Sequence, residues 1–293
     1  MAGRAGRTGC CEDFGRSILI AKDEKEVEML WSEYVNAPAE KVKSMISKGG
    51  DITLPILGLI SSDICKTMDE LIIFLKDTYF GYTIYQNSDP VFRSTFQKTI
   101  ESEVNSLYSD GFLELEGDEI KATEFGKRCA EGSLSPKSAK LIGSALKKIE
   151  SNFIHVPYEE LTEKIIHTAC CTHDVLQGYV LLPVDGQERQ ELLDHWESNE
   201  DAYLVFPEDQ EIMLRSIKTT QMLLKWIKGT PYSKLIALQG QVKRIAETIG
   251  WIVQGIARIS EKPLFDFDDK LIEFLNTLTD RVYFVFPIKL SKL

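Results

Sequence analysis

The strongest constraint on the fold is one amphipathic pattern in residues 241–260, QVKRIAETIGWIVQGIARIS. Isoleucines recur there in alternating steps of four and three, at Ile245, Ile249, Ile252, Ile256 and Ile259. Such steps place one apolar stripe along an α-helix. The pattern therefore predicts a long helix that buries this stripe in a helical core.

A second stripe lies one residue behind the first, at Arg244, Thr248, Trp251, Gly255 and Arg258. Arg244 and Trp251 are two helical turns apart on one face, about 10 Å along the axis. A guanidinium and an indole presented together form a stacking platform for single-stranded nucleic acid. The alternative is that Trp251 only widens the buried face, because large aromatic side chains are mostly core residues.

The charge of the chain is unevenly distributed. The net charge is −11, yet between residues 213 and 262 nine basic residues oppose two glutamates. The nine are Arg215, Lys218, Lys225, Lys228, Lys234, Lys243, Arg244, Arg258 and Lys262. A basic segment in an acidic chain is typical of a focused polyanion site, since local charge steers binding. An ordinary helical hairpin with solvated lysines is the alternative.

Composition excludes several classes of protein. No run of eighteen apolar residues is present, and the N-terminal residues lack the apolar core of a secretory signal. The cysteines include two adjacent pairs, which is not the spacing of a disulfide framework. We therefore expect a cytoplasmic protein without a membrane partner.

The N-terminal residues 1–10, MAGRAGRTGC, hold Arg4 and Arg7 in a frame of Gly3 and Gly6. Two guanidiniums on a tight backbone suit a phosphate that gains charge during transfer. A disordered tail is the alternative. A strand over residues 17–21 and a charged helix over residues 23–34 are expected to follow.

The next part of the chain has a winged-helix pattern. Helices are expected over residues 51–62, 67–79 and 91–108, and a hairpin over residues 112–115 and 119–122. This part is acidic, so we expect a structural wedge between domains rather than a reader of the major groove.

The remaining residues predict helices. They are expected over residues 137–151, 161–171, 213–228 and 233–238, around Leu192 to Trp196, and around Leu271 to Leu278. One of them carries His167, Cys170 and Cys171, with His173 close behind. No zinc site is predicted there, because adjacent cysteines rarely share one tetrahedral ion and the sequence has no CxxC pair.

Several motifs resemble one family. The GRAGR motif, the segments KTMDELIIFLKDTYFGY and GFLELEGDEIKATEFGKRCAEGSLSPKSAKLI, and the run from MLLKWIKGTPYSKLI to VKRIAETIGWIVQGIARI carry the resemblance. The family is the archaeal Hjm-type (Ski-like, superfamily-two) DNA repair helicases, relatives of the helicase part of DNA polymerase theta. The resemblance covers nearly the whole chain but only the C-terminal half of the family's sequence, without its last domain.

The resemblance implies a mainly α fold with a small β content. It implies the end of a second RecA-like lobe in residues 1–35 and a winged-helix domain in residues 36–132. A helical ratchet bundle would follow in residues 133–262, and a C-terminal helical extension in residues 263–293.

The resemblance also implies the C-terminal portion of an ATP-dependent 3′–5′ DNA helicase. Arg4 and Arg7, with Gly3 and Gly6, would face the ATP phosphates. The nucleic-acid-binding residues would be Arg244 and Trp251, with Thr248, Arg258 and Lys243 beside them. The expected partners are single-stranded or forked DNA and a missing motor half. ATP and Mg²⁺ would be cofactors only in a complete motor.

Two motor motifs are absent from the sequence. It has no G-x-x-x-x-G-K-[ST] loop and no D-E-x-H box. We therefore predict that this chain alone hydrolyses no ATP. The alternative function is a non-enzymatic single-strand-binding or regulatory module. The family's glutamine would stand directly before Met1, so whether Met1 is the natural start stays open.

Overall fold

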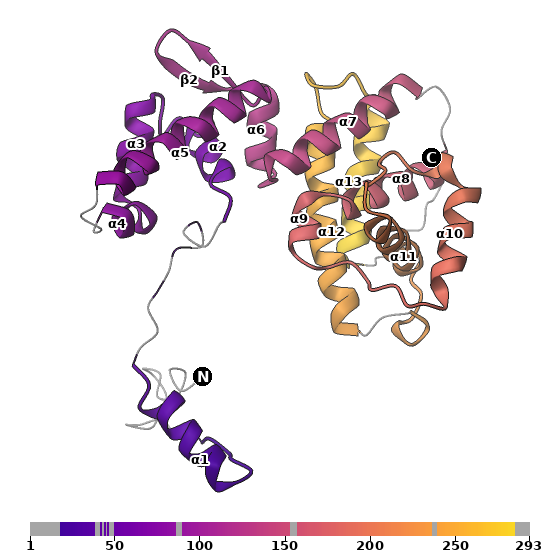
Figure 1. Cartoon of the computed structure of the whole chain (residues 1–293). Helices are drawn as coiled ribbons and strands as arrows, with labels where there is room; N and C mark the ends of the chain where they lie inside the picture. The colour runs from indigo at the N-terminus through magenta and orange to yellow at the C-terminus, as the bar shows by residue number, and fades with distance from the viewer. Residues whose placement is uncertain are drawn as a thin grey trace, which may run out of the picture. The chain divides into compact units, whose positions relative to one another are not determined.

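The computed structural model of the chain divides into two units, Met1–Lys48 and Gly49–Leu293 (Figure 1). The described residues are 18–38, 42, 44, 46, 50–85, 90–152, 157–235 and 239–284. Over these ranges the chain is mainly α-helical with one small antiparallel hairpin, which confirms the predicted fold class. No helix in these ranges has the length and apolar content needed to cross a membrane.

The first unit contains helix α1 (Glu24–Leu30), which continues as a π-helical turn at Trp31–Val35. The carboxylate of Asp23 caps α1 by accepting a hydrogen bond from the N–H of Glu26 at 2.9 Å. The predicted strand is wrong over residues 18–21, which form no regular structure. A strand needs a neighbour to pair with, and the described part of this unit offers none.

Most large apolar side chains in the described part of the first unit are exposed. α1 buries none of its residues. The exposed fractions run from 44% to 87% for Ile18, Leu19, Ile20, Val27, Met29, Trp31, Tyr34 and Val35. Exposed apolar side chains concentrated in one segment are characteristic of a contact with another protein surface.

The first part of the second unit is a group of helices that a β-hairpin follows. Its elements are α2 (Thr53–Ser61), α3 (Met68–Asp77), α4 (Tyr79–Tyr85), α5 (Pro90–Ser109), β1 (Leu113–Glu116), β2 (Glu119–Ala122) and α6 (Glu124–Glu131). The predicted hairpin is confirmed, with Leu113 opposite Ala122 and Gly117 at a φ of +65° in the turn. The N–H of Ile120 also donates to the carbonyl of Lys66 at 2.7 Å, which ties the hairpin to the α2–α3 turn.

The helix predicted over residues 67–79 is α3, which ends at Asp77, and a further helix that was not predicted, α4, follows it. Thr67 caps α3, since its hydroxyl accepts from the N–H of Glu70 at 3.2 Å. At Thr78 the backbone turns extended, with a ψ of 162°. The Thr78 hydroxyl then accepts from the N–H of Gly81 at 3.3 Å, which begins α4.

The rest of the second unit is a helical bundle. Its helices are α7 (Pro136–Asn152), α8 (Tyr158–Cys170), α9 (His173–Gln177), α10 (Glu188–Ser198), α11 (Gln210–Ile227), α12 (Gln239–Ile259) and α13 (Asp269–Phe284). A short 3₁₀ turn lies at Glu200–Ala202. Helix α11 packs against α8, α10 and α13, and α12 packs along α13 (Figure 1).

Helix α11 lies inside this bundle, with ten of its residues buried. Met222, Leu223, Trp226 and Ile227 are among them. The indole N–H of Trp226 donates to the carbonyl of Val282 at 2.9 Å, which joins α11 to α13. Buried indole groups need such a partner, so this bond fixes the relative position of the two helices.

Part of the helix predicted over residues 233–238 lies outside the described residues. The described part is a 3₁₀ turn at Tyr232–Lys234, after which Leu235 is extended. Gly229, at a φ of +78°, ends α11 in the left-handed conformation that glycine tolerates. The chain then reaches α12 through residues 236–238, which lie outside the described ranges.

Candidate nucleic-acid interface

The predicted apolar stripe of α12 is confirmed. Its members Ile245, Ile249, Ile252, Ile256 and Ile259 are each at most 1% exposed. Ile, Val and Ala residues fill this side of the helix, and charged residues lie on the opposite side. The burial of this stripe fixes the rotation of α12 in the bundle, so the position of the second stripe is also fixed.

Arg244 lies at the exposed N-terminal half of α12. One guanidinium nitrogen, Nη2, donates to the carbonyl of Gly178 at 2.9 Å. Gly178 is the C-cap of α9. The last carbonyls of a helix lack partners within it and carry a partial negative charge, so a guanidinium there is stabilising. A guanidinium has five N–H donors, so Arg244 keeps others for a ligand.

Trp251 is half-buried, so the structure places it between the core and solvent. Its indole N–H donates to the carbonyl of Gly132 at 2.9 Å. Gly132 is the C-cap of α6, so the indole joins α12 to the end of α6. Because that N–H is the only donor of an indole, no donor is left for a ligand, and only the exposed part of the ring face is available for a contact.

The C-terminal end of the second stripe also packs against the end of α6. Arg258 is half-buried and donates from Nη1 to the carbonyl of Glu131, the last residue of α6. Gly255 lies so near Leu134 that an added Cβ would stand 2.6 Å from Leu134 Cδ1. The close approach of α12 to Leu134 therefore leaves little room for a side chain at position 255.

The two remaining predicted residues differ in their surroundings. Thr248 is half-buried, and its hydroxyl donates to the carbonyl of Arg244 in its own helix at 2.9 Å. Lys243 is exposed and lies 3.8 Å from the carboxylate of Glu247 one turn away. Lys243 is therefore free to move toward a polyanion, whereas the Thr248 hydroxyl donates to its own helix.

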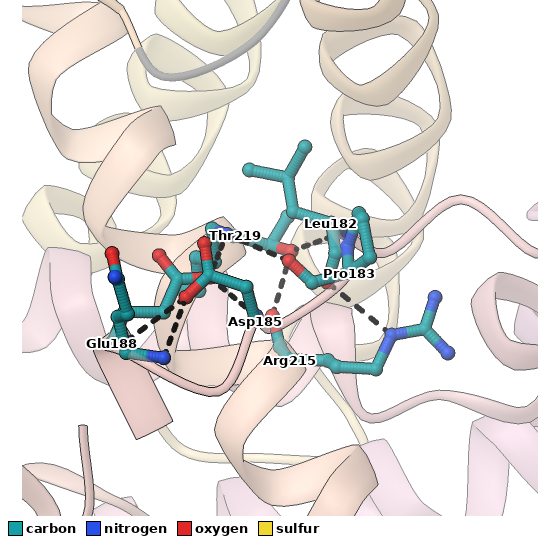
Figure 2. Close-up of polar contacts among 8 residues, drawn as sticks. Leu182, Pro183, Asp185, Glu188, Arg215 and Thr219 are labelled. Atoms are coloured by element: carbon teal, nitrogen blue, oxygen red, sulfur yellow. Dashed lines mark hydrogen bonds and ion pairs between the residues drawn. The ribbon is translucent and has the colours of Figure 1, made fainter. Parts of the chain in front are cut away.

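Arg215 of the basic segment has a structural partner. Its Nε and Nη2 donate to the carbonyls of Leu182 and Leu181 at 3.2 and 2.8 Å. Thr219, one turn later on α11, accepts from the N–H of Leu182 at 3.0 Å. Figure 2 shows these side chains of α11 directed at the connector that precedes α10.

Lys218 holds the same connector. Its ammonium donates to the carbonyl of Pro183 at 2.7 Å and pairs with the carboxylate of Glu188. By contrast, three further lysines of the segment are exposed, namely Lys225, Lys228 and Lys234. Part of the positive charge counted in the sequence therefore stabilises the fold, and the rest is available to solvent.

The predicted nucleotide-facing residues lie outside the described residues. They are Arg4 and Arg7 with their neighbours Gly3 and Gly6. Their roles stay predictions.

The histidine and cysteine stretch on α8 is a packed part of the core. His167 is fully buried, and burial lowers the pKa of its imidazole to about 3. Cys171 Sγ lies 3.8 Å from the imidazole, and Cys170 accepts from the Thr220 hydroxyl at 3.7 Å. Within the described ranges no group of three or more His, Cys, Asp or Glu residues is arranged to hold a metal ion.

Comparison with protein families gives one match. Residues 163–283 match the family described as archaeal helicase, domain 4. The matched range begins in α8 and ends in α13, so it contains all of α12. Arg244, Trp251 and Arg258 therefore lie inside it.

Curated proteins that are similar to this chain include several named ATP-dependent DNA helicase Hel308. The one from Pyrococcus horikoshii is 29% identical over 290 residues, which is 96% of this chain and 38% of that protein. The one from Caldivirga maquilingensis is 24% identical, over 95% of this chain and 39% of that protein. The one from Methanocella arvoryzae is 26% identical, over 89% and 34%. The chain thus spans about two fifths of the length of these relatives or less.

Proposed function

We propose, from the premise that this chain corresponds to the C-terminal part of a Hel308-like helicase, that it binds single-stranded DNA through α12. In a complete ATP-dependent 3′–5′ helicase, α12 would contact the bases of the translocating strand. Its matching residues are Arg244 and Trp251, with Arg258, Thr248 and Lys243 at the margins.

The observation that carries the proposal is the pairing of an exposed cation with a partly exposed indole on one stripe of a fixed helix. Arg244 is exposed and Trp251 half-buried, while the neighbouring isoleucine stripe is fully buried. The buried stripe prevents α12 from rotating, so the indole and guanidinium are preorganised. Base stacking on such a platform tolerates any sequence, because every base has an aromatic face.

The existing hydrogen bonds of Trp251 and Arg244 indicate different roles for the two side chains in DNA binding. The N–H of Trp251 is held by the Gly132 carbonyl, so the indole is expected to read no base edge. Arg244 keeps donors for a phosphate oxygen while one nitrogen stays on Gly178. This arrangement suits movement along a strand, which requires a grip without base preference.

The motor chemistry would come from other parts of a complete helicase. ATP and Mg²⁺ would act there, with Arg4 and Arg7 facing the phosphates. The uncovered apolar side chains of residues 18–35 support a further protein surface against the first unit, either in the same polypeptide or in a separate subunit. We predict that this chain alone releases no phosphate from ATP, with or without DNA. DNA-stimulated hydrolysis that Arg7→Ala abolishes would contradict this prediction.

The test of the proposed function is the affinity for a fluorescent oligo(dT), measured by anisotropy for the wild type, Trp251→Ala and Trp251→Phe. Loss of one stacked base should weaken binding by about 1–3 kcal/mol in Trp251→Ala. Trp251→Phe keeps an aromatic face and loses only the bond to Gly132, so it should retain most of the affinity. A loss below a few tenths of a kcal/mol in Trp251→Ala would leave Trp251 as a core residue and refute the proposal.

The alternative is a non-enzymatic single-strand-binding or regulatory module. Both functions predict the same DNA contact. They differ when the chain is mixed with a motor half that carries those motifs. Restored ATP-dependent unwinding, lost in Trp251→Ala, would support the helicase and contradict the module.

A further inference from the structure

Tyr179 adopts a backbone conformation that tyrosine rarely takes. It directly follows α9 and its C-cap Gly178, and its φ is +49°. Its N–H donates to the carbonyl of Leu176 at 3.2 Å, which closes the end of the helix. A residue in this left-handed position just after a helix is usually glycine, because a Cβ there crowds the backbone.

A glycine stands one residue away from this position. Gly178 has a φ of −77°, which any residue adopts, while Tyr179 takes the left-handed conformation. A glycine at position 179 would satisfy the same helix end without strain. The strain therefore comes from the presence of an aromatic side chain at position 179 rather than from the turn.

The fold gains little from this side chain. The ring of Tyr179 is 84% exposed. Within the described parts of the chain it makes no hydrogen bond and no contact with another aromatic ring. Strained residues that bring no packing benefit are concentrated at functional sites.

The location of Tyr179 connects it to the stripe on α12. The carbonyl of its neighbour Gly178 accepts the hydrogen bond from Arg244 at 2.9 Å. Along α12, the order of contacts is then the end of α9 at Arg244, Gly132 at Trp251 and Glu131 at Arg258. Tyr179 is therefore an exposed aromatic residue directly next in the chain to the carbonyl that holds Arg244.

We infer that Tyr179 is a further base-stacking residue for the same single strand that α12 binds. The inference rests on the proposed function of α12 and adds a contact residue to it. A base on the Tyr179 ring would lie at the Arg244 end of the second stripe, where the guanidinium also attracts the phosphate that follows. Tyrosine suits this role because its ring stacks on any base.

The experiment uses the full chain and compares Tyr179→Gly, Tyr179→Phe and the control Tyr108→Ala. Tyr108 is another exposed tyrosine, on α5 at 49% exposure. Affinity for oligo(dT) is measured by anisotropy and stability by urea denaturation. An oligo(dT) that carries one 5-iodouracil is also photocrosslinked, and the modified residue is identified by mass spectrometry.

We expect Tyr179→Gly to weaken binding about five- to fiftyfold, the effect of one lost stacked base. The same variant should unfold at an equal or higher urea concentration, because glycine relieves the strain. Tyr179→Phe should bind within about twofold of the wild type. Tyr108→Ala should not change the affinity, and the crosslink should fall on Tyr179 in the wild type.

Three results would overturn the inference. Wild-type affinity in Tyr179→Gly, together with weak binding in Trp251→Ala, would remove Tyr179 from the site and leave the proposed function intact. A lower urea midpoint in Tyr179→Gly would assign the ring a structural role instead. Unchanged affinity in both Tyr179→Gly and Trp251→Ala would contradict the proposed function itself.

Discussion

Two helical glycines should respond in opposite ways to the same substitution. Gly255 in α12 and Gly58 in α2 both lie inside helices. Alanine is favoured over glycine in a helix interior by about 1 kcal/mol. Their surroundings differ, so the measured change in the free energy of unfolding reports how closely α12 approaches its neighbour.

At Gly58 an added Cβ meets no atom within 4 Å. Gly58→Ala should therefore stabilise the chain by about 0.5–1 kcal/mol. At Gly255 the added Cβ would stand 2.6, 3.0 and 3.1 Å from Cδ1, Cγ and Cδ2 of Leu134. Leu134 is fully buried and has no open space to enter. Such overpacking costs about 1–3 kcal/mol, so Gly255→Ala should range from neutral to about 2 kcal/mol destabilising.

The assay is urea denaturation followed by circular dichroism. The m-value shows whether each variant exposes the same amount of surface on unfolding as the wild type. Leu134→Ala provides the second arm of a double-mutant cycle. Without the leucine side chain the added methyl group has room, so Gly255→Ala should stabilise that background by about 1 kcal/mol. If Gly255→Ala stabilises the wild type as much as Gly58→Ala does, then α12 does not approach the α6–α7 corner as closely as described.

Burial lowers the pKa of His167 to about 3, whereas the pKa in the unfolded chain is near 6.5. Between these two pH values the unfolded chain binds a proton that the folded chain does not. The free energy of unfolding should therefore fall by up to about 1.4 kcal/mol per pH unit as the pH drops through this window. Urea midpoints near neutral pH and near pH 5 should show this dependence, and His167→Gln should reduce it. Burial also raises the pKa of Cys171 to about 12 and raises that of Cys170, so neither thiol should react with iodoacetamide until urea unfolds the chain, as read by peptide mass spectrometry. Trp226→Phe should lower the free energy of unfolding by about 1–3 kcal/mol in urea denaturation, because it leaves the buried carbonyl of Val282 without its donor. A decrease of less than about 0.5 kcal/mol would mean that water replaces the indole as the donor.

Local patterns in the sequence predict much of the helical fold. The isoleucine steps in α12 predict both the helix and its buried face, because a helix repeats every 3.6 residues wherever it occurs. The hairpin follows equally from alternating residues on either side of Gly117, which takes the positive φ that the turn requires. These features depend on residues close to one another in sequence.

The break between α3 and α4 could not be predicted from periodicity, because apolar residues continue through it. The structure gives a signal at Gly81, where an added Cβ would stand 2.3 Å from the carbonyl of Leu75. The glycine permits α4 to fold back closely on the end of α3. A single glycine in a helical pattern does not by itself distinguish a close approach from a tolerated substitution.

The chemistry of the candidate site was only partly predictable. A count of charges cannot separate Arg215, whose carbonyl partners lie more than thirty residues away, from an exposed lysine such as Lys225. The same limit applies to the carbonyls that receive Arg244 and Trp251, which come from α9 and α6. The strained conformation of Tyr179 was not predictable either, because the adjacent Gly178 is the residue that a pattern would assign to that position.

The connector held by α11 has a consequence for cleavage by proteases. Residues 179–187 form no helix or strand, so they would normally be the first segment to be cut. Proteases, however, require several residues of chain to leave the surface and enter the active site. Val180, Leu181 and Leu182 are buried, and backbone groups of Leu181 and Leu182 are bonded to Arg215 and Thr219. The bundle should therefore survive brief digestion as one fragment across this irregular segment.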